Sequence, residues 1–256
     1  MSTPLYPPSR PQSIGEVLDT TFKLLGVSLV KTLPYGVLMT LAGQLGNIDN
    51  LLAGRHARIF VPRDPATWLL WTVSMVLSLT LWAALILRQR AIAQAFPVSM
   101  RAELATVLRR LPSLILLGIL LFTALCVGTL LLIVPGVYLA IALSMATPAL
   151  VLAGKSPVDA MKYSLELIRG HWWRTLGIFL VTAVILAAFY ILAIVVTVIL
   201  VRFARGADVA LVTAATTVLV IALGAFANPC VTAMVLAVFG DLEARRAASA
   251  ASPQEA

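Results

Sequence analysis

Six long apolar runs, separated by segments rich in charged residues, dominate the pattern of hydrophobic and polar positions along this chain. A helix needs about 20 predominantly apolar residues to cross the hydrocarbon core of a bilayer. The pattern therefore predicts six transmembrane helices, at residues 30–47, 68–87, 111–134, 136–152, 176–201 and 209–239. The expected fold class is an all-α, polytopic helical membrane protein.

Two positions within these runs carry turn or kink signals. Pro135-Gly136 interrupts an apolar stretch that is too long for one crossing, which predicts a tight hairpin between the third and fourth spans. Asn228-Pro229 lies inside the last run, where the proline removes a backbone donor and kinks or breaks the helix. Asn228 either lines a pathway, as broken helices do in transporters, or serves helix packing. The small residues around Asn228 favour packing.

Three further segments have a helical apolar period but too many charges to cross a membrane. In residues 156–174 the apolar face consists of Val158, Met161, Leu165, Ile168 and Trp172. Ser156-Pro157 begins this helix with a capping serine and a first-turn proline. Residues 13–34 and 99–111 are weaker versions of the same plan. Because each segment precedes a pair of spans, we expect three hairpins, each introduced by a cytoplasmic amphipathic helix lying on the membrane.

The charge balance changes this picture by predicting an orientation. The 256 residues are 61% hydrophobic and 12% charged, with 19 Lys and Arg against 11 Asp and Glu. A basic excess in such an apolar chain indicates an anionic membrane face rather than nucleic acid. Thirteen basic residues fall on the side of the N-terminus, Lys31 marks the first boundary, and five fall opposite: Arg55, Arg58, Arg63, Arg202 and Arg205. Because positive residues stay in the cytoplasm, both termini are predicted to be cytoplasmic.

Basic and aromatic residues near the ends of the spans form the expected membrane-interface set: Lys31, Arg109, Arg110, Lys162, Arg169, Trp172, Trp173 and Arg174. Long cationic side chains reach toward headgroups from such positions, and indoles prefer the same level. Lys31 corresponds to Arg174 when residues 13–34 are aligned with 156–174, so we interpret Lys31 as an anchor rather than an intramembrane site. The expected partners are anionic lipids of the cytoplasmic face, with a second copy of the chain or another membrane protein.

Residue patterns typical of catalysis, metals or cofactors are not recognised. His56 and His171 are predicted on opposite sides of the membrane, and Cys126 and Cys230 lie in apolar runs, where cysteine behaves as a small hydrophobe. Neither HExxH nor a glycine-rich nucleotide signature occurs. We therefore expect a protein that is not an enzyme and has no cofactor. It would consist of a single membrane domain at 13–243 between disordered tails at 1–12 and 244–256.

Three blocks of the sequence carry a family resemblance: SIGEVLDTTFKL near the start, IVPGVYLAIALSMATPALVLAGKSPVDAMKYSLELIRGHWW in the centre, and NPCVTAMVLAVFGDLE near the end. Through them the whole chain resembles the YciC-like bacterial inner-membrane proteins, a family also labelled glycerophosphoryl diester phosphodiesterase membrane domain. The resemblance implies a multi-pass protein of the bacterial cytoplasmic membrane without an assigned molecular activity. The label implies an association with glycerophosphodiester hydrolysis in fused relatives, but this chain has no segment long or polar enough to be the hydrolase.

Two functional interpretations remain after these observations. The leading one is a non-catalytic integral membrane protein that serves envelope or lipid organisation, or acts as an accessory membrane subunit. The alternative is a small transporter or channel for an apolar or lipid-like solute, with a pathway near Asn228 and Pro229. The scarcity of ionisable residues inside the spans argues against ion-coupled transport.

Overall fold

The computed structural model of the chain describes residues 6–45, 65–97, 99–203 and 209–251. Within these ranges the backbone forms helices and turns and no strand. Six segments are long and apolar enough to cross a membrane: Ile14–Gln44, Pro65–Ala93, Leu111–Leu131, Ile133–Ala153, Trp172–Ile199 and Ala215–Ala251. The all-helical class and the six candidate spans are thus confirmed for the described part of the chain.

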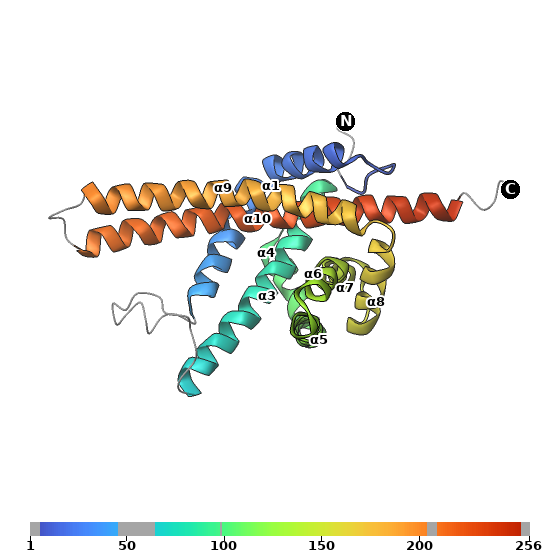
Figure 1. Cartoon of the computed structure of the whole chain (residues 1–256), viewed down its shortest axis with the longest axis horizontal. Helices are drawn as coiled ribbons and strands as arrows, with labels where there is room; N and C mark the ends of the chain where they lie inside the picture. Colours follow the sequence, from blue (N-terminus) through green and yellow to red (C-terminus); the bar gives the residue numbers. More distant parts are fainter. Residues whose placement is uncertain (1–5, 46–64, 98, 204–208, 252–256) are drawn as a thin grey trace.

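The first amphipathic segment and the first span form one continuous helix, α1 (Ile14–Gln44). Its start is a complete capping box, because Ser13 and Glu16 each accept a hydrogen bond from the other's backbone N–H. Pro34 lies inside α1, and Figure 1 shows that the helix changes direction between its dark-blue and lighter-blue parts. The expected junction between surface helix and span is therefore a bend within one helix.

The next span, α3 (Pro65–Ala93), leads into the short helix α4 (Met100–Arg109), in the segment where the weakest amphipathic helix is expected. One side of α4 packs against the protein through Glu103 and Val107, which are buried. The other side leaves Leu108 and Arg109 exposed. The buried face of this helix contacts other helices of the chain.

The third and fourth spans meet at Leu132, so the prediction of a turn at Pro135-Gly136 is wrong. Leu132 has an extended backbone (φ −168°, ψ 152°) between α5 (Leu111–Leu131) and α6 (Ile133–Ala142). Pro135 fits the first turn of α6, where its missing N–H would have no helical acceptor. Gly136 instead permits close helix contact, since a Cβ there would lie 3.0 Å from the Cα of Thr129 on α5.

The fourth span, predicted as one helix, is interrupted. After α6 ends at Ala142, residues 143–145 form a turn, and α7 (Ala146–Ala153) completes the segment. Gly154 ends α7 in the left-handed conformation (φ 66°, ψ 23°) that glycine adopts without steric cost. The interruption exposes backbone groups inside an apolar segment, which requires partners from elsewhere in the fold.

The last three helices are α8 (Pro157–Ile168), α9 (Trp172–Phe203) and α10 (Val209–Ala251). Pro229 lies inside α10 without ending it. The expectation of a disordered tail from residue 244 is wrong as far as Ala251, because α10 continues to that residue. Arg245, on this extension, pairs with Asp241 one turn earlier and supports the helix there. Residues 252–256 lie outside the described ranges.

The long helices are not arranged as a parallel bundle (Figure 1). In that view α9 and α10 lie side by side along the long axis, whereas α5 and α6 are seen nearly end-on, so this pair crosses the direction of α9 and α10. The first helix, α1, packs mainly against α10 and α3. The core lies between these helices and includes Tyr35, Leu85, Ile86, Leu236 and Phe239.

Candidate functional site

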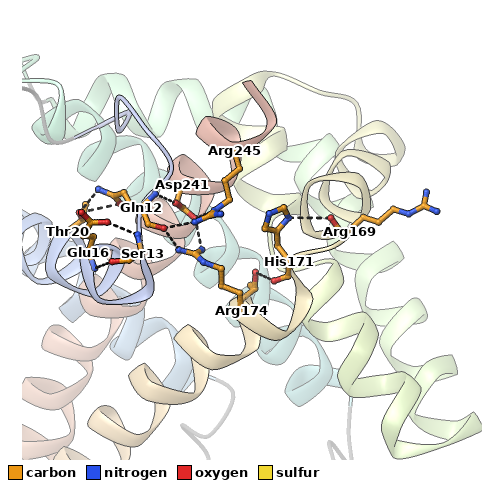
Figure 2. Close-up of polar contacts among 10 residues, drawn as sticks. Gln12, Ser13, Glu16, Thr20, Arg169, His171, Arg174, Asp241 and Arg245 are labelled. Carbon is orange, nitrogen blue, oxygen red and sulfur yellow. Dashed lines mark hydrogen bonds and ion pairs between the residues drawn. The ribbon is translucent and has the colours of Figure 1, made fainter. Parts of the chain in front are cut away.

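A fully buried carboxylate on α10, Asp241, joins the N-terminal segment to α9 and α10 (Figure 2). Its Oδ2 accepts hydrogen bonds from Arg174 Nη1 at 2.6 Å and Arg245 Nε at 3.1 Å, and its Oδ1 accepts the Gln12 N–H at 2.7 Å. Both arginines also donate to the Gln12 carbonyl, at 2.6 Å and 2.5 Å respectively. Two cations and a backbone amide thus compensate the burial of Asp241.

This cluster bears on two expectations from the sequence. Arg174, expected at the membrane interface, has its guanidinium paired with Asp241. Residues 6–12 belong to the segment expected to be a disordered tail, yet they are held on the protein. Tyr6 is buried against Gly240 of α10, where a Cβ would lie 2.7 Å from Tyr6 Cε2. The acid that makes these contacts possible lies far away in the sequence, and only the fold brings it to Arg174.

A second buried ion pair fastens α4 to α1 and α3. Arg88 Nε lies 2.9 Å from Glu103 Oε2, and the Tyr35 hydroxyl donates to the same oxygen at 2.6 Å. The Arg88 guanidinium also donates to the Lys31 carbonyl at 2.9 Å and lies 4.9 Å from the centre of the Tyr35 ring. From the sequence, Arg88 contributed only to the count of basic residues that predicts the orientation. The sequence did not identify Glu103 as its partner.

Arg110, predicted at the membrane interface, binds the end of α7. Its Nη1 donates to the carbonyls of Leu150 and Val151 at 3.0 Å and 3.4 Å. Arg90 Nη1 donates to the carbonyl of Leu152 at 3.2 Å. The last carbonyls of a helix have no helical donors and carry partial negative charge, so arginines stabilise them. Arg110 and Arg90 therefore serve to anchor α7.

Most of the predicted interface residues are exposed, including Arg110. The others are Lys31, Arg109, Lys162, Arg169 and Trp173. The half-buried Trp172 donates its indole N–H to the Tyr138 carbonyl at 3.2 Å and stacks on the Tyr138 ring with 5.7 Å between centroids. Its indole thus holds the start of α9 against α6.

Asn228 lies in the contact between α1 and α10. Its Nδ2 donates to the Gly36 carbonyl and to Thr40 Oγ1, both at 3.4 Å. The neighbouring Gly224 also faces α1, because a Cβ on it would lie 2.9 Å from Thr40 Cβ. Pro229 is buried, and its carbonyl accepts a hydrogen bond from Gln89 Nε2 at 2.8 Å. These contacts support the packing interpretation of Asn228 and Pro229 over the pathway interpretation.

A cavity of about 440 Å³ lies elsewhere, between α3, α5, the α6–α7 segment, α9 and α10. Its lining is apolar except for Ser144, Thr147 and Thr182. The Ser144 hydroxyl donates to the Ile141 carbonyl at 2.7 Å, and the Thr182 hydroxyl donates to the Ile178 carbonyl at 3.1 Å. The volume falls in the range of about 300–1,000 Å³ that is common for small-molecule sites.

The interrupted span forms part of this cavity wall, and a serine of α8 binds the backbone at its turn. The buried Ser164 hydroxyl donates to the Ala142 carbonyl at 2.7 Å and accepts the Met145 N–H at 3.1 Å. One side chain thus satisfies both an acceptor and a donor beside the turn. Sequence reasoning missed Ser164, whose only signal was a hydroxyl beside the apolar face of a predicted helix.

Among the described residues, no group of three or more His, Cys, Asp or Glu side chains is placed to hold a metal ion. His171 Nδ1 lies 3.4 Å from the Arg169 carbonyl (Figure 2). His56, which the sequence places on the opposite side of the membrane, lies outside the described residues.

The six candidate spans define an integral, multi-pass membrane protein. No protein-family model, curated protein or solved structure matches the chain.

Proposed function

We propose that the protein is a non-catalytic component of the bacterial inner membrane that binds anionic lipid headgroups at its cytoplasmic face. In this role it serves envelope or lipid organisation, alone or as an accessory to another membrane protein. The observation that carries the proposal is the exposed face of α8. Val158, Lys162, Leu165 and Arg169 follow one another there at helical spacing and form what we call the α8 stripe.

The α8 stripe combines apolar and cationic side chains in the way expected of a helix on a membrane surface. Val158 and Leu165 are 50% and 40% exposed, while Ile168, predicted to face the lipid, is 1% exposed and packs on the protein. The acids of α8 are engaged, since Asp159 accepts from Ser156 and Glu166 pairs with Arg246. No ion pair of Lys162 or Arg169 occurs among the described residues, so both cations are available to phosphate groups.

The proposal includes cytoplasmic termini and three hairpin units. In support, α1 packs on α3, α5 packs on α6, and α9 packs on α10. Four of the five basic residues counted on the opposite side, Arg55, Arg58, Arg63 and Arg205, lie outside the described residues, and Arg202 is exposed near the end of α9. The resemblance to YciC-like proteins belongs to the same proposal and rests on the sequence blocks alone.

Removing the two cations of the α8 stripe tests the proposal. We expect Lys162→Gln with Arg169→Gln to reduce the phosphatidylglycerol that remains bound to the gently purified protein, because each basic residue near an anionic surface contributes about 1 kcal/mol. Native mass spectrometry measures the bound lipid. The matched control, Lys23→Gln with Arg202→Gln, removes the same charge from exposed positions outside α8 and should retain the lipid. Equal losses in the two variants would contradict α8 as the binding surface.

A second function, movement of an apolar or lipid-like solute, is favoured by the interrupted α6–α7 segment on the cavity wall. If the protein moves such a solute, reconstituted liposomes should transfer a fluorescent lipid analogue between leaflets. Ala140→Phe, which fills the cavity, should abolish that transfer, whereas Asn228→Leu should leave it intact because Asn228 faces α1. Transfer that survives Ala140→Phe but is lost in Asn228→Leu would restore the pathway interpretation of Asn228.

A further inference from the structure

We infer that the cavity between α3, α5, the α6–α7 segment, α9 and α10 is a binding site for one hydrocarbon chain of a membrane lipid. Each lining segment belongs to a candidate span, so the cavity lies at the depth of the bilayer where hydrocarbon is the surrounding medium. The proposed headgroup surface on α8 is a separate feature, and the chain site does not depend on it. Binding in the cavity also requires no movement of lipid across the membrane.

The lining determines the chemistry of the occupant. Large apolar side chains line the wall, among them Trp82, Leu125, Phe179, Leu186, Val231 and Met234, and no charged side chain contributes to it. Two of the three hydroxyl groups, those of Ser144 and Thr182, already donate to carbonyls of the same segment or helix. A polar ligand would lose its hydration without regaining enough hydrogen bonds, whereas a hydrocarbon chain loses none.

The cavity lies beside exposed apolar positions of two helices. Three residues next in sequence to cavity-lining positions are highly exposed: Phe122 on α5 is 62% exposed, and Leu180 and Val184 on α9 are 60% and 61% exposed. Large apolar side chains at this exposure are expected to contact acyl chains in a membrane protein. A lipid chain therefore has an apolar route from the bilayer into the cavity.

The interruption between α6 and α7 forms part of the wall of the proposed lipid site. Irregular backbone at membrane depth is tolerated where it is buried in protein or lines a cavity. Leu143 and Ser144 of the turn line the cavity. Ser164 binds the Ala142 carbonyl just before the turn and the Met145 N–H at its end. Ser164 is thus a positioning residue that holds the irregular wall in place.

The test uses the full chain with Trp82 as its sole tryptophan, after Phe replaces Trp68, Trp71, Trp172 and Trp173. It is reconstituted in phosphatidylcholine vesicles whose acyl chains carry bromine, which quenches nearby indole fluorescence. We expect strong quenching of Trp82, because it lines the cavity. Ala183→Phe fills the cavity and should abolish the quenching. Val184→Phe, at the adjacent lipid-facing position, should retain it.

Three results would overturn the inference: no quenching of Trp82, equal quenching in all three proteins, or loss in Val184→Phe with retention in Ala183→Phe. Circular dichroism establishes that each variant is folded, and Ala140→Phe fills the same cavity from α6 if Ala183→Phe does not fold. The zwitterionic vesicles separate this site from the proposed headgroup surface. Lys162→Gln with Arg169→Gln should therefore keep the quenching, whatever its effect on anionic lipid.

Discussion

Replacing Asp241 by Asn is expected to destabilise the protein by about 3–5 kcal/mol, the usual effect of removing one partner from a buried ion pair. Asn keeps the size of the side chain and an oxygen for the Gln12 N–H, but it leaves Arg174 and Arg245 without their counter-charge. The N-terminal segment should detach at the same time, because both arginines that bind the Gln12 carbonyl are oriented by Asp241. Thermal unfolding in detergent measures the first effect, and limited proteolysis near Gln12 measures the second.

The matched control is Glu166→Gln, which removes the carboxylate of an exposed ion pair with Arg246. Exposed pairs contribute about 0–1 kcal/mol, since solvent screens both charges. Its melting temperature should therefore stay close to that of the unchanged protein. If Asp241→Asn were as stable as Glu166→Gln, the cluster in Figure 2 could not be what holds the N-terminal segment.

Gly36→Ala is expected to push α1 away from α10 and to destabilise the fold strongly. A Cβ at residue 36 would lie 2.8 Å from the Cα of Ala225 and close to the carbonyl oxygen of the same residue. These are backbone atoms, so no rotamer change relieves the overlap. The Ala225 carbonyl is also the one that Pro229, four residues later, leaves without a helical donor. Overpacking of this kind costs about 1–3 kcal/mol and more where the neighbour cannot move.

Gly26→Ala on the same helix is the control for Gly36→Ala. A Cβ at residue 26 meets nothing within 4 Å, and alanine is favoured over glycine in a helix by about 1 kcal/mol. We expect the melting temperature in detergent to fall sharply for Gly36→Ala and to stay the same or rise for Gly26→Ala. Similar losses in both variants would mean that the contact between α1 and α10 is not as close as the structure places it.

Parts of the candidate site could be expected from local sequence and parts could not. The α8 helix was predictable because Ser156-Pro157 and the apolar period act within a few residues. The availability of Lys162 and Arg169 follows from the same period. The contacts of Arg110 and Arg174 within the protein were not predictable. A cation beside a span has the same sequence pattern whether its partner is a lipid phosphate, a helix carbonyl or a distant carboxylate.

The position of the cavity was also not predictable from local sequence patterns. Asn228-Pro229 and Pro135-Gly136 were the visible irregularities in the apolar runs, yet neither marks the cavity or the turn. The interruption at residues 143–145 has no proline or glycine. Pro148, in the first turn of α7, lacks the N–H that would bind the Ser144 carbonyl, so it favours a break at this point. Ser164, on another helix, stabilises the turn with a donor and an acceptor.

The sequence by itself determined that the chain is helical, that six segments are apolar enough to cross a membrane, and where several helices begin. Those properties depend on hydropathy summed over about 20 residues and on capping within a single turn, both of which are local. Tertiary structure decided which arginines are paired, that residues 6–12 are held on α10, where the fourth span is interrupted, and which helices enclose the cavity. Each of these depends on contacts between residues far apart in the chain, which local patterns do not encode.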